Sequence, residues 1–122
     1  MLEVIRKWEV IPFRYGLDCC QFVRDCVKHE TGHDFGAGLE YSTEFGAARI
    51  LKKHGGMSGL LTHVFGEPVD EPRDGDVAMC IMVDGSEVAA MVFDSRIILR
   101  TETGITDWPL SRGEAFWRPA CG

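Results

Sequence analysis

The chain has 122 residues, 45% hydrophobic and 26% charged, a composition that excludes a largely disordered protein and fits a single domain, residues 1–122. Its 13 basic and 19 acidic residues give a net charge of −6, which disfavours nucleic acid and anionic membranes as partners. Because no apolar run approaches the roughly 20 residues that cross a bilayer, we expect no membrane span.

The first ten residues alternate apolar and charged side chains, and the first helix is expected to begin at Cys19. Asp18 is a typical N-cap, and Gln21 three positions later completes a capping box. An apolar stripe at helical spacing follows, and Gly32 is a natural end. The stripe consists of Phe22, Val23, Cys26 and Val27.

Two further helices are predicted before the middle of the chain. One runs from near Ser42 to His54 and stops at a pair of glycines, and a shorter one covers Ser58–Phe65. The stretch Glu67–Gly75, with two prolines and four acidic residues, is typical of a loop.

Strands are predicted over the second half of the chain. Asp84-Gly85 predicts a type I′ turn between the first two strands, because that turn needs positive φ at both central residues. The pattern indicates an α+β fold, with helices in about 1–66 followed by an antiparallel sheet in about 75–118. The expected strands are Val77–Val83, Glu87–Phe93, Arg96–Thr101, Ile105–Leu110 and Phe116–Arg118.

The five cysteines are an odd number, so they cannot form a complete intramolecular disulfide framework. The N-terminus has no signal-peptide core, and we therefore expect thiols made in a reducing compartment. Cys19 is the candidate nucleophile, because unpaired N–H groups and the positive dipole end at a helix start favour a thiolate. The alternative is that Cys19 and Cys20 are small residues packed at the start of a helix.

Several segments, in order, resemble a family of small phage and prophage proteins related to the NlpC-like cell-wall cysteine peptidases. Trp8 and the segment PFRYGLDCCQF resemble the family's opening W…PF-x-[WY]-G-x-x-D-C-x-x-F. The other matching segments are 31–34 (TGHD), 41–56 (YSTEFGAARILKKHGG), 75–78 (GDVA), 103–111 and 115–118 (AFWR). The resemblance implies a papain-like, NlpC-like fold, a gene from a tail-morphogenesis region, and a nucleophile at Cys19.

One position departs from the active NlpC-like enzymes. They carry the base, a histidine, at the start of the strand after the first hairpin, and Val88-Ala89-Ala90 at that place contains none. His29 lies ten residues beyond Cys19 on the same predicted helix, about 15 Å away, and cannot activate it. His63 is the candidate substitute base, with His54 or another subunit as alternatives, and Tyr15, just upstream of Cys19, is a candidate oxyanion donor.

The main functional expectation is therefore a catalytically degenerate papain-like protein of the phage or prophage tail tip or tail assembly. Other tail-tip proteins are its expected partners, and it would be made in the host cytoplasm before joining the virion tail. The alternative is an active cysteine hydrolase that cuts a peptide or amide bond in peptidoglycan, with a peptidoglycan peptide as its partner.

A metal module is a third hypothesis. Cys26, His29 and His33 are spaced i, i+3 and i+7, which places them on one helix face, and Cys80 or Cys121 could supply a fourth ligand for zinc. The chain has no CxxC knuckle and no glycine-rich phosphate loop, and we expect no cofactor.

Overall fold

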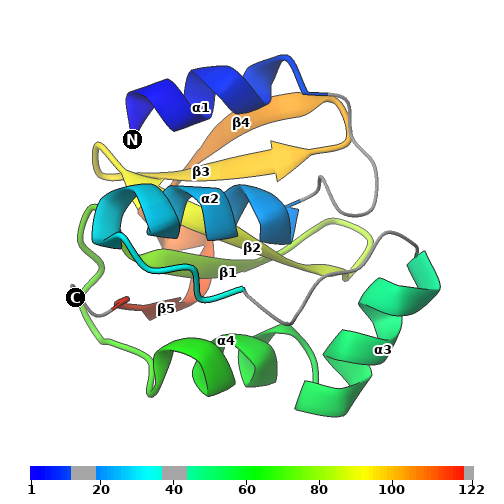
Figure 1. Ribbon diagram of the computed structural model, residues 1–122. Coiled ribbons are helices and arrows are strands. Elements are labelled where there is room, and N and C mark those ends of the chain that lie inside the picture. The colour runs from blue at the N-terminus through cyan, green and yellow to red at the C-terminus, as the bar shows by residue number, and fades with distance from the viewer. Residues whose placement is uncertain (12–18, 37–43, 120–122) are drawn as a thin grey trace.

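A computed structural model describes residues 1–11, 19–36 and 44–119. In these ranges the fold is α+β, with four α-helices preceding a five-stranded antiparallel sheet (Figure 1). The helices are α1 (Leu2–Glu9), α2 (Cys19–Thr31), α3 (Glu44–His54) and α4 (Met57–Phe65). The strands are β1 (Val77–Ile81), β2 (Glu87–Phe93), β3 (Arg96–Thr101), β4 (Gly104–Pro109) and β5 (Gly113–Trp117), with a 3-10 turn at Leu110–Arg112.

The sheet has the order β4-β3-β2-β1-β5. β4 and β5 lie at opposite edges, yet only Leu110–Arg112 joins them. Four chain steps reach at most about 14 Å, whereas four strand spacings in a flat sheet span about 19 Å. The sheet must therefore curl, and it does so around a second small core on the face away from α2.

Alternate residues of the strands face two different cores. Val77, Met79, Ala89 and Met91 pack with the helices, whereas their neighbours pack in the concave core. α1 lies along β4, α2 crosses β2, and α4 lies beside β5 (Figure 1). The concave core consists of Ala78, Cys80, Ala90, Val92, Ile97 and Leu99.

The predicted helix at Cys19 is confirmed, with its expected stripe buried. It ends as predicted, because Gly32 has a φ of +79° and its N–H donates to the carbonyl of Lys28. The helix α1 was not among the predicted elements. Its buried residues Val4, Ile5 and Trp8 have helical spacing, but the charged residues between them give the segment an alternating pattern.

The type I′ prediction at Asp84-Gly85 is wrong. β1 ends at Ile81, and a five-residue loop follows, in which Gly85 but not Asp84 has a positive φ. The expected geometry lies instead at Asp94-Ser95, where φ is +54° and +57° in the two-residue connection of β2 to β3. Asp74 accepts a hydrogen bond from the Ser95 N–H at 3.0 Å and supports this unusual backbone.

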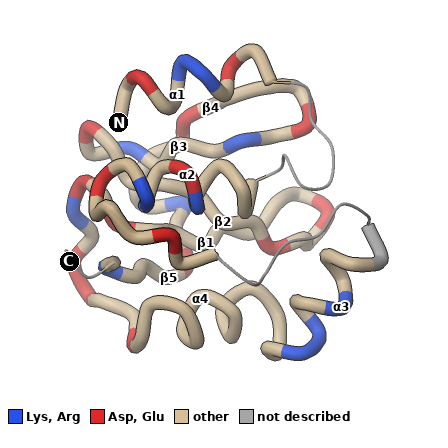
Figure 2. Tube along the Cα trace, in the orientation of Figure 1, with Lys and Arg blue, Asp and Glu red and all other residues tan. Residues whose placement is uncertain are grey.

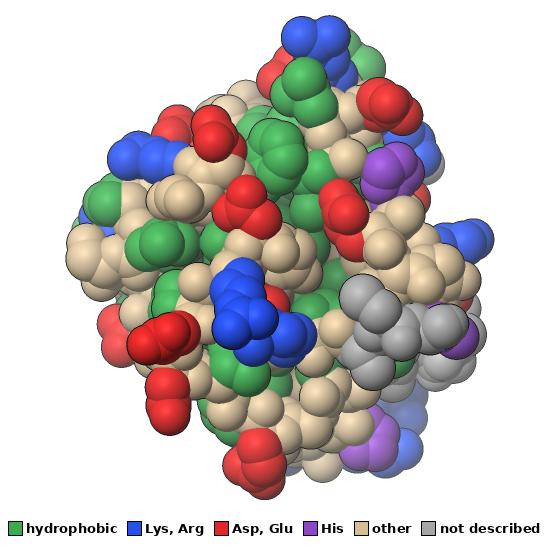
Figure 3. Space-filling model, turned by 90° about the vertical axis from the view of Figure 1, so that its left-hand side faces the viewer, with side chains coloured by type: hydrophobic (Ala, Val, Ile, Leu, Met, Phe, Trp, Pro, Cys, Tyr) green, Lys and Arg blue, Asp and Glu red, His purple; other side chains and the backbone are tan. Residues whose placement is uncertain are grey.

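Within the described ranges no helix is both long and apolar enough to cross a bilayer. Figure 3 shows the side that lies at the left in Figure 1. Acidic side chains are scattered over that face, and basic side chains form small separate groups.

Candidate functional site

Cys19 is the first residue of α2, and its half-buried side chain lines an open cleft of about 660 Å³. The start of α2, the β1–β2 hairpin and the β3–β4 turn come together there, at the right in Figure 1. The cleft is therefore built from the ends of elements, where side chains can change without disturbing the sheet. Besides Cys19 its walls are Met82, Val83, Asp84, Ser86, Glu87, Val88, Leu99, Arg100, Thr101, Glu102 and Thr103.

Arg100 is the one basic side chain among the described residues that line this cleft. It is only 4% exposed and donates hydrogen bonds to the carbonyls of Trp8, at 3.2 Å, and Ile11. Its Nε has no hydrogen-bond partner. The sequence interpretation did not single out Arg100, although a cation inside the apolar strand RIILRT was a visible signal.

The carboxylates of the cleft lie at its exposed rim. Asp84 and Glu87 are on the β1–β2 hairpin and Glu102 is in the β3–β4 turn, and Figure 2 shows both segments carrying acidic residues. Hydrogen bonds from Ser86 lower the pKa of Asp84. Glu87 is engaged outside the cleft, because its Oε1 accepts the Met57 N–H at 3.1 Å and so caps α4.

All four histidines lie in the described ranges, and none of them lines the Cys19 cleft. His63, the candidate base, is on α4, and its ring lies 4.6 Å from that of His54, centroid to centroid. His29 is 3.4 Å from the N-terminal amine, and His33 lies against Phe35. The structure therefore does not bring His63 and Cys19 to one cleft.

The segment Val88-Ala89-Ala90, where the resemblance predicts that an active enzyme would carry a histidine, lies beside the cleft. Val88 lines it, whereas Ala89 and Ala90 are buried in the two cores on either side of β2. None of the three side chains can accept a proton. Tyr15 and Asp18 lie outside the described residues, so the oxyanion role of Tyr15 and the N-cap stay predictions.

Cys20, the neighbour of Cys19, lines a different hollow. This small apolar cavity of about 70 Å³ lies between α2, α3 and α4, and Cys20, Ile50 and Leu61 are among its lining residues. Cys19 and Cys20 are both thiols outside any disulfide. Adjacent positions of the helix therefore place two thiols in different surroundings.

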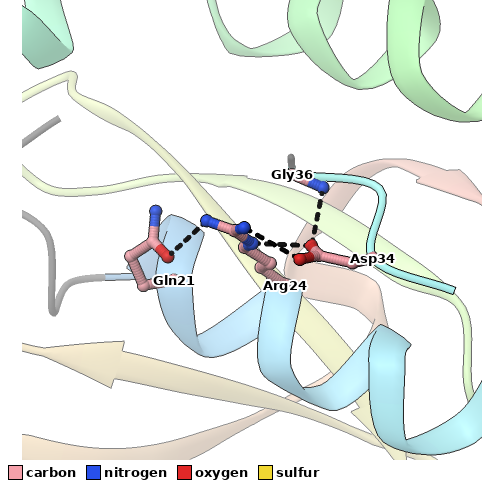
Figure 4. A network of polar contacts seen from close by, with 4 residues as sticks. All are labelled: Gln21, Arg24, Asp34 and Gly36. Carbon is pink, nitrogen blue, oxygen red and sulfur yellow. Dashed lines mark hydrogen bonds and ion pairs between the residues drawn. The ribbon is translucent and has the colours of Figure 1, made fainter. Parts of the chain in front are cut away.

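A network of polar contacts joins α2 to the residues that follow it, through Arg24, Asp34 and Gly36 (Figure 4). Arg24 makes a two-point ion pair with Asp34, at 2.6 and 2.8 Å, and donates to Gln21 at 3.4 Å. Asp34 also accepts the Gly36 N–H, and the Arg24 guanidinium lowers the pKa of Asp34. The segment 31–34, one of those that carry the family resemblance, thus fastens the chain back onto α2.

The zinc hypothesis is not supported in the described ranges, where no three suitable side chains converge. Cys26 is fully buried in the helix-side core, and burial raises the pKa of its thiol. Burial likewise raises the pKa of Cys80 to about 11. Both thiols are therefore core residues, which is the ordinary role of a buried cysteine.

The fold and site together define an α+β domain in which a cysteine opens a helix against an antiparallel sheet and faces an open cleft. The chain belongs to the DUF6950 family, described as a domain of unknown function, whose model matches residues 1–119. No curated protein matches the chain.

Proposed function

We propose that the protein is a catalytically degenerate papain-like domain that serves as a component of a phage or prophage tail tip or tail assembly. The observation that carries the degenerate part is the cleft itself. Cys19 opens α2 and lines the cleft, yet all four histidines lie elsewhere, and Val88-Ala89-Ala90, near which the resemblance expects the base, contains no histidine. Acyl transfer from a thiol needs a group that moves the proton to the leaving amine.

The papain-like part of the proposal is supported by the order and packing of the elements. A helix that begins with the cysteine crosses β2 of an antiparallel sheet, and helices precede strands along the chain. The tail part rests on the resemblance to phage and prophage proteins. It implies synthesis in the host cytoplasm, incorporation into the virion tail, and other tail-tip proteins as partners.

Alkylation of Cys19 as a function of pH, read by mass spectrometry, tests the degenerate part. We expect no cleavage of purified peptidoglycan fragments at any pH at which Cys19 is alkylated. Cys19→Ser serves as the control for peptide assignment. Cleavage of those fragments by the wild type, lost in Cys19→Ser, would overturn the proposal.

Purified tails test the assembly part. In a host that produces the phage particles, we expect the chain to sediment with intact tails, and Cys19→Ser to assemble as well as the wild type. Deletion of the gene should leave incomplete tails. Normal infectious tails from the deletion strain, with the chain recovered only from the host fraction, would contradict this role.

An active peptidoglycan hydrolase is the second candidate, favoured by the opening of Cys19 to a cleft rather than to the core interior. Here Sγ of Cys19 attacks the carbonyl carbon, the C–N bond breaks, and a base such as His63 passes the thiol proton to the leaving amine. Water then hydrolyses the thioester. Digestion of peptidoglycan fragments by His63→Ala and Tyr15→Phe tests these roles, since each should reduce turnover without loss of folding.

A further inference from the structure

Arg100 carries a buried positive charge for which no described residue supplies a carboxylate. Of its five N–H groups, one bonds to the Trp8 carbonyl and one to the Ile11 carbonyl, and Nε bonds to none. Two backbone carbonyls do not neutralise a guanidinium that is 4% exposed. A buried charge of this kind is costly unless an opposite charge pairs with it.

The rim carboxylates of the cleft do not cancel this charge. Asp84, Glu87 and Glu102 are all exposed, so water screens their charges more strongly than it screens the buried guanidinium. Mobile ions reduce the exposed charges further.

We propose that the Cys19 cleft receives a peptide that carries a carboxylate, and that Arg100 supplies the charge that binds it. Because its terminal nitrogens already bind carbonyls and its Nε is buried, Arg100 acts on the peptide carboxylate through its charge rather than through a two-point contact. The identity of the peptide as part of a tail partner rests on the proposed function. The preference of the cleft for an anion does not.

A purely structural role for Arg100 predicts a different result. If Arg100 only fastens the end of α1 through Trp8 and Ile11, any preference of the cleft for anions over neutral molecules of the same shape comes from the start of α2 and does not depend on Arg100. Iodoacetate and iodoacetamide are such a pair, since both alkylate a thiolate with loss of iodide and differ by one negative charge.

The experiment measures both alkylation rates at Cys19 by mass spectrometry at low salt. We expect the ratio of iodoacetate to iodoacetamide rates to be at least about threefold higher in the folded protein than at the same cysteine in urea. The excess should fall as sodium chloride is added. A folded ratio equal to or below the unfolded one would overturn the proposal without any variant.

Arginine variants identify the residue whose charge causes the anion preference. Arg100→Gln should bring the ratio to the unfolded value or below, whereas Arg96→Gln should leave it unchanged, because Arg96 is exposed on the same strand and pairs with Asp107. An unchanged anion preference in Arg100→Gln would show that Arg100 is not its cause and would overturn the proposal. Cys26 is fully buried and serves as the internal reporter of folding. If it becomes reactive in Arg100→Gln, Arg100→Lys, which keeps the charge and should keep the preference, decides instead.

Protection by peptides completes the test. A tripeptide with an acetylated N-terminus, an amidated C-terminus and a central glutamate should slow iodoacetamide at Cys19 more than its glutamine counterpart does, and only while Arg100 is present. Equal protection by both peptides would contradict carboxylate recognition. Failure of the tail-assembly experiment would leave these rates unchanged, so the two proposals can fail separately.

Discussion

Asp76 and Arg118 are 42 residues apart and form a two-point ion pair, with Nε to Oδ1 at 3.0 Å and Nη2 to Oδ2 at 2.9 Å. The Asp76 carboxylate is 2% exposed and also accepts the Arg73 N–H, while its carbonyl accepts the Val92 N–H. One residue thus joins the loop before β1, strand β2 and the end of β5. Two of the segments that carry the family resemblance, 75–78 and 115–118, meet in this structural contact.

Asp76→Ala is expected to lower the free energy of unfolding by about 1–3 kcal/mol, because it removes the acceptor of the Arg73 N–H and the buried carboxylate that binds the partly exposed Arg118. Urea denaturation followed by tryptophan fluorescence measures the change. Asp107→Ala is the matched control, since Asp107 pairs with Arg96 in an exposed contact that should contribute less than about 1 kcal/mol. Equal midpoints for the two variants would contradict this interpretation of Asp76.

Gly59→Ala is expected to destabilise the protein by about 1–3 kcal/mol. In an ordinary helix interior the same change stabilises by up to about 1 kcal/mol. The sign of the change in unfolding free energy therefore distinguishes a close helix contact from an ordinary helix position. At Gly59 an added Cβ would overlap the carbonyl oxygen of His54, where α3 and α4 meet. Urea midpoints measure the effect, with the adjacent Ser58→Ala as control. A stabilised Gly59→Ala would show that the two helices separate without cost.

Stability is expected to fall as the pH drops below about 6.5, the ordinary histidine pKa. Partial burial, together with the neighbouring His63 and Lys53, lowers the pKa of His54. The unfolded chain therefore binds its proton at a higher pH than the folded chain, and acidification favours unfolding. Melting temperatures between pH 5 and 7.5 measure this, and His63→Gln should make the decline shallower. An identical decline in His63→Gln would remove the His54–His63 pair as its cause.

Val88→His is expected to increase the rate at which Cys19 is alkylated at pH 7. Val88 is half-buried in the same cleft as Cys19, and a histidine there would supply a base that the described residues of the cleft lack. A nearby imidazole favours the thiolate, which is the reactive form. Val10→His places the same side chain at an exposed position that does not line the cleft and should have little effect. Equal rates in the two variants would contradict the placement of Val88.

The sequence predicted most of the elements because their signals are local. The stripe from Phe22 to Val27 and the stop at Gly32 lie within one helix, and each predicted strand overlaps an observed one. The position of the type I′ turn was harder to predict from the sequence. Asp84-Gly85 has the typical composition of a type I′ turn, but positive φ at both positions occurs at Asp94-Ser95, where Asp74 from a distant loop supports it.

The candidate site was only partly predictable, because some of its contacts are made by residues that are distant in the sequence. Cys19 could be placed at a helix start from its neighbours, whereas the partners of His63 and Arg100 are set by packing. His63 meets His54 because α3 and α4 form a close pair. Arg100 lies in the cleft because β3 ends beside the start of α2. Neither relationship has a spacing along the chain that would reveal it.

The arrangement of Cys19 and Cys20 has a practical consequence for labelling. Cys19 faces an open cleft with charged walls, whereas Cys20 faces a small apolar cavity between helices. A charged, water-soluble probe and a compact apolar probe should therefore each select a different sulfur, although the two residues are neighbours. Two dyes attached in this way would report separately on the motion of the hairpin beside α2 and on the separation of the helices behind it.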